Sequence, residues 1–165
     1  MMFQKNIKEN DIICIWGNSG SGKTIALNEL YKRYKKESIF IKNFYDESNF
    51  NNDKIKIFFI DDIFIYITKK EKEKFIKKAR KYNKKIVFST SNPEEILYAS
   101  YIYLLNDCKI KLEGNIKDVL KNEKVIKELG LKNPFLVDLS IQLIHYDLIN
   151  KIYTNKKELI KDIWE

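Results

Sequence analysis

The residues with the clearest chemical meaning form a glycine-rich stretch near the amino terminus, which fits G-x-x-x-x-G-K-[ST] at every specified position. Glycines at these spacings let backbone N–H groups turn toward a polyphosphate without interference from Cβ atoms. We expect Lys23 to supply a positive charge for the β- and γ-phosphates, and the Thr24 hydroxyl to be a ligand of Mg²⁺. The predicted phosphate-binding residues are Gly17, Asn18, Ser19, Gly20, Ser21, Gly22, Lys23 and Thr24.

Two neighbouring aspartates follow an apolar run at residues 57–60 and complete the predicted metal and catalytic groups. Asp61 is in the position from which a carboxylate holds Mg²⁺ through water, opposite Thr24. The alternative for Asp61 is a solvated aspartate at a strand end. Asp62 is the candidate to orient or deprotonate an attacking water, and its alternative is a helix or turn cap.

A polar stretch at residues 89–92 follows the next apolar run, and we expect it to lie near the γ-phosphate. Asn92 is expected to cap a helix, so Ser91 or Thr90 is favoured as the side chain that senses the phosphate or positions the water. The predicted catalytic residues are Lys23, Asp62 and Ser91.

The cysteines and the histidine suggest no further chemistry. Cys14 and Cys108 are isolated in the sequence, and we expect both to be buried free thiols. His145 is the only histidine, which excludes a metal site built from several histidines and favours a structural or surface role.

These side chains need a scaffold, and the hydrophobic periodicity predicts alternating strands and helices. Apolar runs predict strands at residues 11–16, 38–42, 54–60, 85–90, 101–105 and 109–112. Helical patterns predict helices at residues 22–36, 69–83, 116–122, 123–129, 134–150 and 156–164, and another that Asn92 and Pro93 open in a capping box with Glu95.

This alternation predicts an α/β P-loop NTPase fold, with a mostly parallel sheet and helices on both faces. The nucleotide is expected at the carboxyl ends of the strands. We expect one nucleotide-binding domain over residues 1–165, with a core to about residue 113 and a helical extension over about 114–165.

Composition limits the classes of function. The chain has 165 residues, of which 44% are hydrophobic, and a formal charge of +8. Because only two of the 31 basic residues are arginines, a solvated lysine surface is favoured over a nucleic-acid interface, and nucleic acid is not an expected partner. No apolar run approaches the roughly 20 residues of a membrane span, so we expect a cytoplasmic protein that is at most peripheral to a membrane.

Beyond the phosphate loop, the chain resembles ATP-binding-cassette (ABC) ATPases, especially the ATPase subunits of energy-coupling-factor (cobalt-type) vitamin transporters. Residues 101–120 are similar to the late hairpin and helix of that family, and residues 43–50 weakly resemble its glutamine loop. Three tail segments are also similar: ELGLKNP at 128–134, LSIQL at 139–143 and NKKEL at 155–159. The resemblance implies an ABC-type ATP-binding protein that uses Mg²⁺ and is associated with transport.

The middle of that family's domain has no counterpart in this sequence. Residues 25–56 alone separate the phosphate loop from the strand that precedes Asp61, which is too short for the family's helical subdomain. No glycine occurs between Gly22 and Gly114, so the glycine-containing signature motif is absent. Asp62 stands where the family has its catalytic glutamate, and Ser91 or a neighbour where it has a histidine. In the family each ATP lies between one subunit's phosphate loop and another's signature motif, so hydrolysis is expected to be weak or to depend on a partner.

The expected partner is a full-length ABC ATPase subunit that lends its signature motif, or a membrane permease. Two other functions stay open. One is a non-hydrolysing, nucleotide-dependent interaction module, and the other is an AAA-type initiator or helicase-loader ATPase, which residues 60–63 and 89–93 resemble. Such ATPases usually place an arginine finger across a subunit interface, for which Arg33 and Arg80 are the only candidates. The shortage of arginines also disfavours a nucleotide kinase.

Overall fold

The computed structural model describes residues 6–44, 46–62 and 66–164. The strands are β1 (Ile12–Trp16), β2 (Ser38–Phe40), β3 (Ile57–Asp61), β4 (Lys85–Thr90), β5 (Tyr101–Asn106) and β6 (Lys109–Asn115). The α-helices are α1 (Asn6–Glu9), α2 (Lys23–Tyr34), α3 (Lys69–Lys81), α4 (Ile116–Leu120), α5 (Glu123–Glu128), α6 (Phe135–His145) and α7 (Lys156–Trp164). Short 3₁₀ helices are η1 (Lys35–Glu37), η2 (Ser48–Asn51) and η4 (Pro93–Tyr98). Tyr45 and Ile63, which belong to two of the resemblances noted above, lie outside the described residues.

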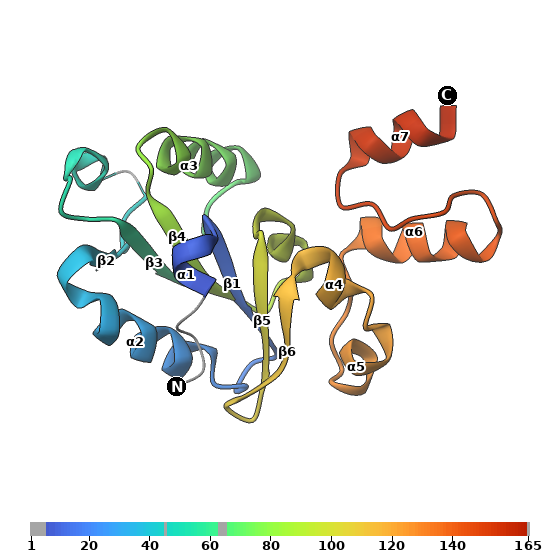
Figure 1. Cartoon of the computed structure of the whole chain (residues 1–165), viewed down its shortest axis with the longest axis horizontal. Helices are drawn as coiled ribbons and strands as arrows, with labels where there is room; N and C mark the ends of the chain where they lie inside the picture. The colour runs from blue at the N-terminus through green and yellow to red at the C-terminus, as the bar shows by residue number, and fades with distance from the viewer. Residues whose placement is uncertain (1–5, 45, 63–65, 165) are drawn as a thin grey trace.

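A mixed sheet forms the centre of the described chain, with strand order β2-β3-β4-β1-β5-β6 (Figure 1). Strands β1 to β5 run parallel to their neighbours, and β6 is antiparallel to β5. The predicted mostly parallel sheet is therefore confirmed. Because β1, β3 and β4 are parallel, their carboxyl ends meet at one edge of the sheet, and this edge holds the phosphate loop, Asp61 and Thr90.

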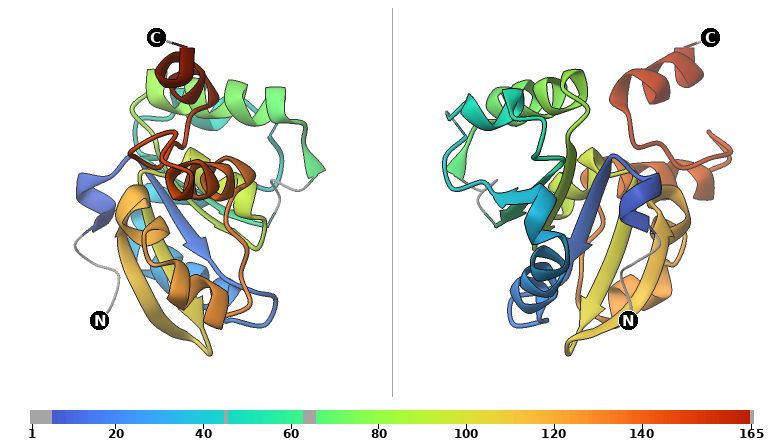
Figure 2. Two further views of the ribbon diagram at one scale, coloured as in Figure 1. Left: turned by 90° about the vertical axis from the view of Figure 1, so that its right-hand side faces the viewer. Right: turned by 60° about the vertical axis from the view of Figure 1, so that its left-hand side comes forward.

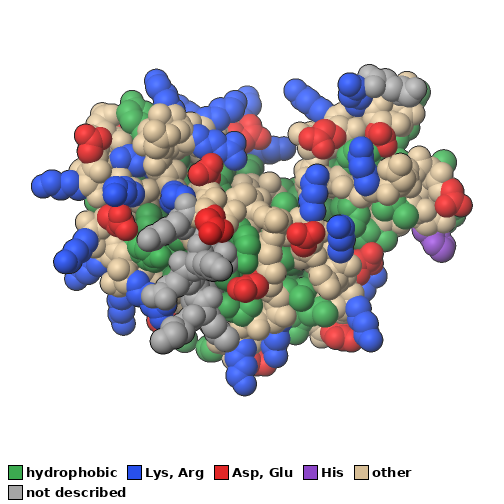
Figure 3. Space-filling model, in the orientation of Figure 1, with side chains coloured by type: hydrophobic (Ala, Val, Ile, Leu, Met, Phe, Trp, Pro, Cys, Tyr) green, Lys and Arg blue, Asp and Glu red, His purple; other side chains and the backbone are tan. Residues whose placement is uncertain are grey.

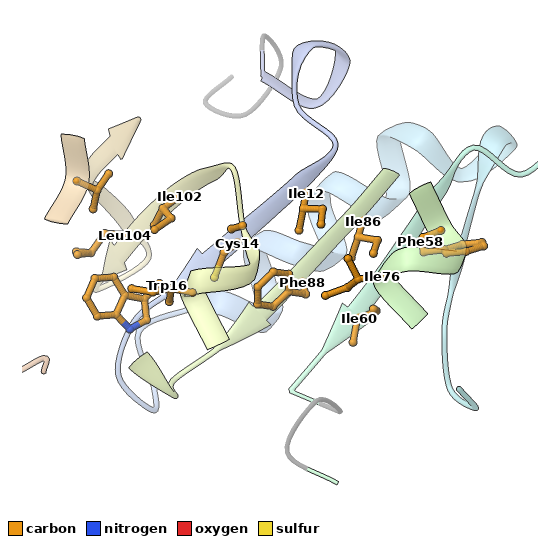
Figure 4. Close-up of a cluster of buried hydrophobic side chains, with 14 of the residues drawn as sticks. Ile12, Cys14, Trp16, Phe58, Ile60, Ile76, Ile86, Phe88, Ile102 and Leu104 are labelled. Atoms are coloured by element: carbon orange, nitrogen blue, oxygen red, sulfur yellow. The ribbon is translucent and has the colours of Figure 1, made fainter. Parts of the chain in front are cut away.

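Strand β1 is buried on both faces of the sheet, and its side chains alternate between two apolar clusters. Ile12, Cys14 and Trp16 belong to the larger cluster (Figure 4). This cluster also contains side chains of α3 and of α4 to α6. Ile13 and Ile15 belong to the other cluster, which α2 covers. Helices on both faces, as predicted, thus enclose the strand that leads into the phosphate loop.

Two helices begin differently from expectation. Asn92 caps η4 as predicted, but its side chain accepts a hydrogen bond from the N–H of Glu94. The predicted capping box with Glu95 is wrong, because the Glu95 carboxylate points into the core and binds other partners. A capping box does open α3, where Thr68 and Glu71 bind each other's backbone N–H groups.

Helix α6 ends at His145, five residues before the predicted end at residue 150. The backbone of Asp147 is left-handed, with φ of 56°. The N–H of Asp147 binds the carbonyl of Ile144, and the N–H of Leu148 binds that of Leu143. This is the Schellman pattern, which usually has glycine at the left-handed position. Aspartate there ends the helix without an obvious stop signal in the sequence.

The C-terminal part of the chain packs in two different ways. Helices α4 and α5 bury side chains in the main apolar cluster with β1 and β5. Helix α7 and the segment before it form a separate small cluster around Ile149, Tyr153 and Leu159, which rests on α6. Figures 1 and 2 accordingly show α6 and α7 to one side of the sheet.

The surface and the two cysteines bear on several of the sequence expectations. Lysine side chains are spread over the face shown in Figure 3 rather than gathered in one patch. Within the described residues, no helix is both long and apolar enough to cross a membrane. Cys14 is buried, as expected, and burial raises the pKa of its thiol well above the usual value. Cys108 is exposed, because it lies in the turn between β5 and β6, so the expectation that it is buried is wrong.

Candidate nucleotide-binding site

The glycine-rich loop connects β1 to α2 in the middle of the sheet and turns through two left-handed glycines. The φ angles are 79° at Gly20 and 93° at Gly22, a region that residues with a Cβ atom seldom adopt. Gly17 has a steric reason to be glycine, since a Cβ there would lie 2.5 Å from the carbonyl oxygen of Leu105. A Cβ on Gly22 would lie 2.6 Å from the sulfur of Cys108. Glycine is therefore required at these positions by conformation or by space.

The amino terminus of α2 is free of the groups that usually neutralise such an end. Its N-cap residue is Gly22, which has no side chain to cap it, and its first turn contains no acidic residue. The N–H groups of the first turn and the positive end of the helix dipole are thus available to an anion. This is the local arrangement that the sequence pattern predicted.

Lys23 is buried, with 5% of its surface exposed, and its ammonium group folds back over the loop. Its Nζ donates a hydrogen bond of 2.9 Å to the backbone carbonyl of Asn18. Ser21 Oγ is buried nearby and has no hydrogen-bond partner within the described chain. A concentrated positive charge and an unused hydroxyl therefore belong to the same loop.

Thr24 and Asp61 come together across the sheet edge, as the sequence analysis expected of a metal site. Thr24 Oγ1 donates to Asp61 Oδ1 at 3.3 Å. Ser89 Oγ donates to the same oxygen at 2.5 Å, because Asp61 on β3 is the direct neighbour of Ser89 on β4. Ser89 belongs to the polar stretch expected near the γ-phosphate but was not favoured within it, and its contact with Asp61 follows from the register of β3 and β4.

Asp62 lies next to these groups in a strained conformation, with φ of 47°. Its backbone N–H donates to Ser89 Oγ at 3.2 Å. Its Oδ1 is buried and has no hydrogen-bond partner in the described part of the molecule. Burial raises the pKa of this carboxyl above its usual range; Lys23 opposes the rise, and the charges of Asp61 and Glu95 add to it.

The segment after β4 divides into an exposed and a buried part. Ser91 is exposed, whereas Thr90 is buried and its Oγ1 donates to Glu95 Oε2 at 2.5 Å. Lys72 of α3 donates to the other oxygen of Glu95 at 2.6 Å. The Thr90 hydroxyl is thus already engaged, which leaves Ser91 as the accessible hydroxyl of the two. Glu95, which the sequence predicted only as part of a capping box, is thus the shared acceptor of Thr90 and Lys72.

One family profile covers most of the chain. The family described as Novel STAND NTPase 3 matches residues 3–136. Two curated relatives are named as ABC transporter ATP-binding proteins. The relative from Clostridium acetobutylicum is 35% identical over 72 residues, which cover 41% of this chain and 26% of that protein. The relative from Methanosarcina mazei is 37% identical over 73 residues, which cover 44% of this chain and 26% of that protein. The chain therefore spans about a quarter of the length of these relatives.

Solved structures of ABC proteins have a similar fold. An ATP-binding subunit of an ABC transporter matches with a TM-score of 0.51 and 12% identity, over 81% of this chain and 88% of that chain. A bacterial Atm1-family ABC exporter with ATP bound matches with a TM-score of 0.52 and 9% identity, over 72% of this chain and 36% of that chain. The expected resemblance to ABC ATPases is thus confirmed for the fold. The chain belongs to the Novel STAND NTPase 3 family, and its P-loop NTPase fold is similar to that of ABC ATPase subunits.

Proposed function

We propose that this protein binds Mg·ATP through the loop Gly17–Thr24 and the first turn of α2. The observation that carries the proposal is the loop itself: two left-handed glycines, the buried ammonium of Lys23 and an uncapped helix end converge on one place. A triphosphate supplies the negative charge that this arrangement lacks. The names of both curated relatives describe them as ATP-binding, which favours adenine over other bases.

The residues at the sheet edge fit a magnesium ion. Mg²⁺ takes hard oxygen ligands, and usually combines one or two protein oxygens with phosphate oxygens and water. The Thr24 hydroxyl and the Asp61 carboxylate are 3.3 Å apart, and Ser89 helps to hold the Asp61 carboxylate by donating to the same oxygen. Bound Mg²⁺ would neutralise phosphate charge. Within the protein, Asp61 would hold it through water and Thr24 would bind it directly.

Hydrolysis is the second part of the proposal, and Asp62 is its key residue. Its Oδ1 has no hydrogen-bond partner among the described residues and lies near Lys23, Asp61 and Ser89, so it is able to accept a hydrogen bond from an attacking water. Ser91 is the exposed hydroxyl that would sense the γ-phosphate or position that water. With these groups alone we expect slow turnover.

The proposed dependence on a partner rests on what lies between α2 and β3. Among the described residues, that connection contains β2 and two 3₁₀ helices, η1 and η2, and no α-helical subdomain. We propose a relation to energy-coupling-factor ATPase subunits, based on the tail segments, with a full-length ABC subunit or a permease as partner in the cytoplasm. A partner that contributes a signature motif would raise the turnover number.

Calorimetric titration with Mg·ATP tests the binding proposal. We expect binding by the unmodified protein and none by Lys23→Ala, because the ammonium supplies the charge that the triphosphate needs. Lys111→Ala removes an equal charge from the exposed face of β6 and should leave the affinity unchanged. Failure of the unmodified protein to bind Mg·ATP would contradict the proposal.

The steady-state rate of phosphate release from ATP then distinguishes an ATP-hydrolysing enzyme from a non-hydrolysing interaction module. Asp62→Asn should reduce turnover by a factor of about 10² or more while Mg·ATP still binds. Tight binding without any turnover in the unmodified protein would favour the non-hydrolysing module. Equal turnover in the unmodified protein, Lys23→Ala and Asp62→Asn would rule out catalysis at this site.

A further inference from the structure

The tail segment ELGLKNP, residues 128–134, makes a contact with the phosphate loop that its sequence does not predict. Asn18 Nδ2 donates a hydrogen bond of 2.7 Å to the backbone carbonyl of Leu129, which is 111 positions away in the chain. A Cβ on Gly130 would lie 3.8 Å from the same nitrogen. The end of α5 therefore lies directly against the second residue of the loop.

The geometry of this helix end explains why the Leu129 carbonyl is available. Gly130 is left-handed, with φ of 67°, and its N–H binds the carbonyl of Lys127. The N–H of Leu131 binds the carbonyl of Ile126. This Schellman motif satisfies the carbonyls one turn back and leaves that of Leu129 without a partner in its own helix. Asn18 supplies the missing donor.

The other end of the same segment holds the polypeptide that follows β4. The N–H of Phe135, at the start of α6, donates to Glu94 Oε1 at 2.6 Å. No side chain of α6 itself caps this end, so the Glu94 carboxylate acts as the cap and opposes the positive end of the helix dipole. Glu94 is three residues from Ser91, the proposed phosphate-sensing residue.

The segment between these two contacts is anchored in the core. Leu131 within the segment, and Ile126 and Val137 on either side of it, are buried in the main apolar cluster, which also contains Trp16, the residue before Gly17. A displacement of the loop or of the segment after β4 is therefore opposed by a well-packed piece of the tail.

We propose that residues 129–135 act as a strap that holds the phosphate loop and the segment after β4 in register for nucleotide, with Asn18 and Glu94 as positioning residues. The inference rests on the proposed binding of ATP. Because coupling between two parts of a protein is reciprocal, a nucleotide that orders the loop must also stabilise the strap.

Amide hydrogen exchange with and without Mg·AMP-PNP, a non-hydrolysable analogue, tests the strap. In the unmodified protein we expect slower exchange over residues 129–137 when the analogue binds. Asn18→Ala should bind the analogue about threefold to tenfold more weakly, which corresponds to the loss of one hydrogen bond, and should lose the slowing at 129–137. Glu94→Ala should lose the slowing at the start of α6, and Glu94→Gln should restore it because the amide oxygen still accepts from Phe135.

Asn122→Ala is the matched control. The Asn122 side chain makes the same kind of bond, from Nδ2 to a backbone carbonyl at 2.8 Å, but its acceptor is Asp118 of α4, only four positions earlier in the chain. We expect this variant to keep both the affinity and the slowing. The strap would be overturned, and the proposed function left standing, by either of two results. The analogue could bind without slowing amide exchange at residues 129–137, or it could slow that exchange in Asn18→Ala as much as in the unmodified protein. Absence of binding by the unmodified protein would overturn both.

Discussion

At the scale of single residues, Asp62 carries a conformational and an electrostatic cost at one position. Its φ of 47° lies in the left-handed region, which costs a non-glycine residue about 1 kcal/mol. Its carboxyl is partly buried, with one oxygen that has no hydrogen-bond partner among the described residues, and burial raises its pKa. Costs of this kind persist where a function requires them, which supports a role beside the phosphate loop.

Substitution of Asp62 by asparagine should therefore stabilise the fold at neutral pH. Because the pKa of Asp62 is higher in the folded than in the unfolded chain, the ionised carboxyl opposes folding above its folded pKa. Below the ordinary value of 3.8 the carboxyl is protonated in both states, and this penalty disappears. Thermal unfolding in EDTA should thus show a higher Tm for Asp62→Asn at about pH 7 and no difference at about pH 3.

Asp53→Asn is the control for this measurement. Asp53 is exposed in the connection before β3, and its substitution should leave the Tm unchanged at both pH values. A lower Tm for Asp62→Asn than for the unmodified protein at neutral pH would mean that the charge stabilises the fold. The electrostatic account of Asp62 would then be wrong.

At the scale of secondary-structure elements, a buried ion pair joins α3 to the segment after β4. Lys72 and Glu95 are 2.6 Å apart, and their side chains are 12% and 2% exposed. Glu95 also accepts from the Thr90 hydroxyl, and the Thr90 carbonyl accepts from the N–H of Gly17 at 3.4 Å. Helix α3 is thus connected to the first residue of the phosphate loop by three consecutive polar contacts.

Removal of one member of this pair should be costly. Lys72→Ala leaves the charge of Glu95 buried without its ammonium, and we expect the free energy of unfolding to fall by about 3 kcal/mol. The double variant Lys72→Met, Glu95→Gln should recover a large part of this lost free energy of unfolding, since the glutamine side chain still accepts from Thr90. Urea denaturation measures the free energy of unfolding of the single and of the double variant. As a control, Lys127→Ala breaks an exposed pair with Glu123 and should lower the free energy of unfolding by less than about 0.5 kcal/mol. An equally small loss for Lys72→Ala would contradict the prediction.

The elements differ in how far the sequence predicts them, because some signals are local and others are not. Helix α5 ends at Glu128, within one residue of the predicted end at 129, since Gly130 supplies the left-handed conformation that a helix end favours. Asp147 ends α6 in the same conformation but is not a recognised stop signal. The contact of Ser89 with Asp61 depends on the order and register of two strands, and the burial of Glu95 depends on where α3 packs. Neither is encoded in local spacing.

At the scale of the whole molecule, α6 connects two apolar clusters of unequal size. Val137 faces the main cluster, which also contains Trp16, whereas Leu139 and Leu143 pack on the smaller cluster. The smaller cluster has three buried members in the described chain, and the main one extends across the sheet. We therefore expect the main cluster to provide most of the cooperative stability, with α7 held by a few contacts.

Two leucine-to-alanine substitutions test this division. Leu120→Ala removes a fully buried side chain from the main cluster and should lower the free energy of unfolding by about 2–4 kcal/mol. Leu159→Ala should instead release α7, so that trypsin cleaves faster at Lys151 and Lys156 while the main unfolding midpoint and the affinity for Mg·AMP-PNP change little. If Leu159→Ala shifts the main midpoint as far as Leu120→Ala does, α7 belongs to the same cooperative unit as the phosphate loop, and motion at the nucleotide site would reach the end of the chain.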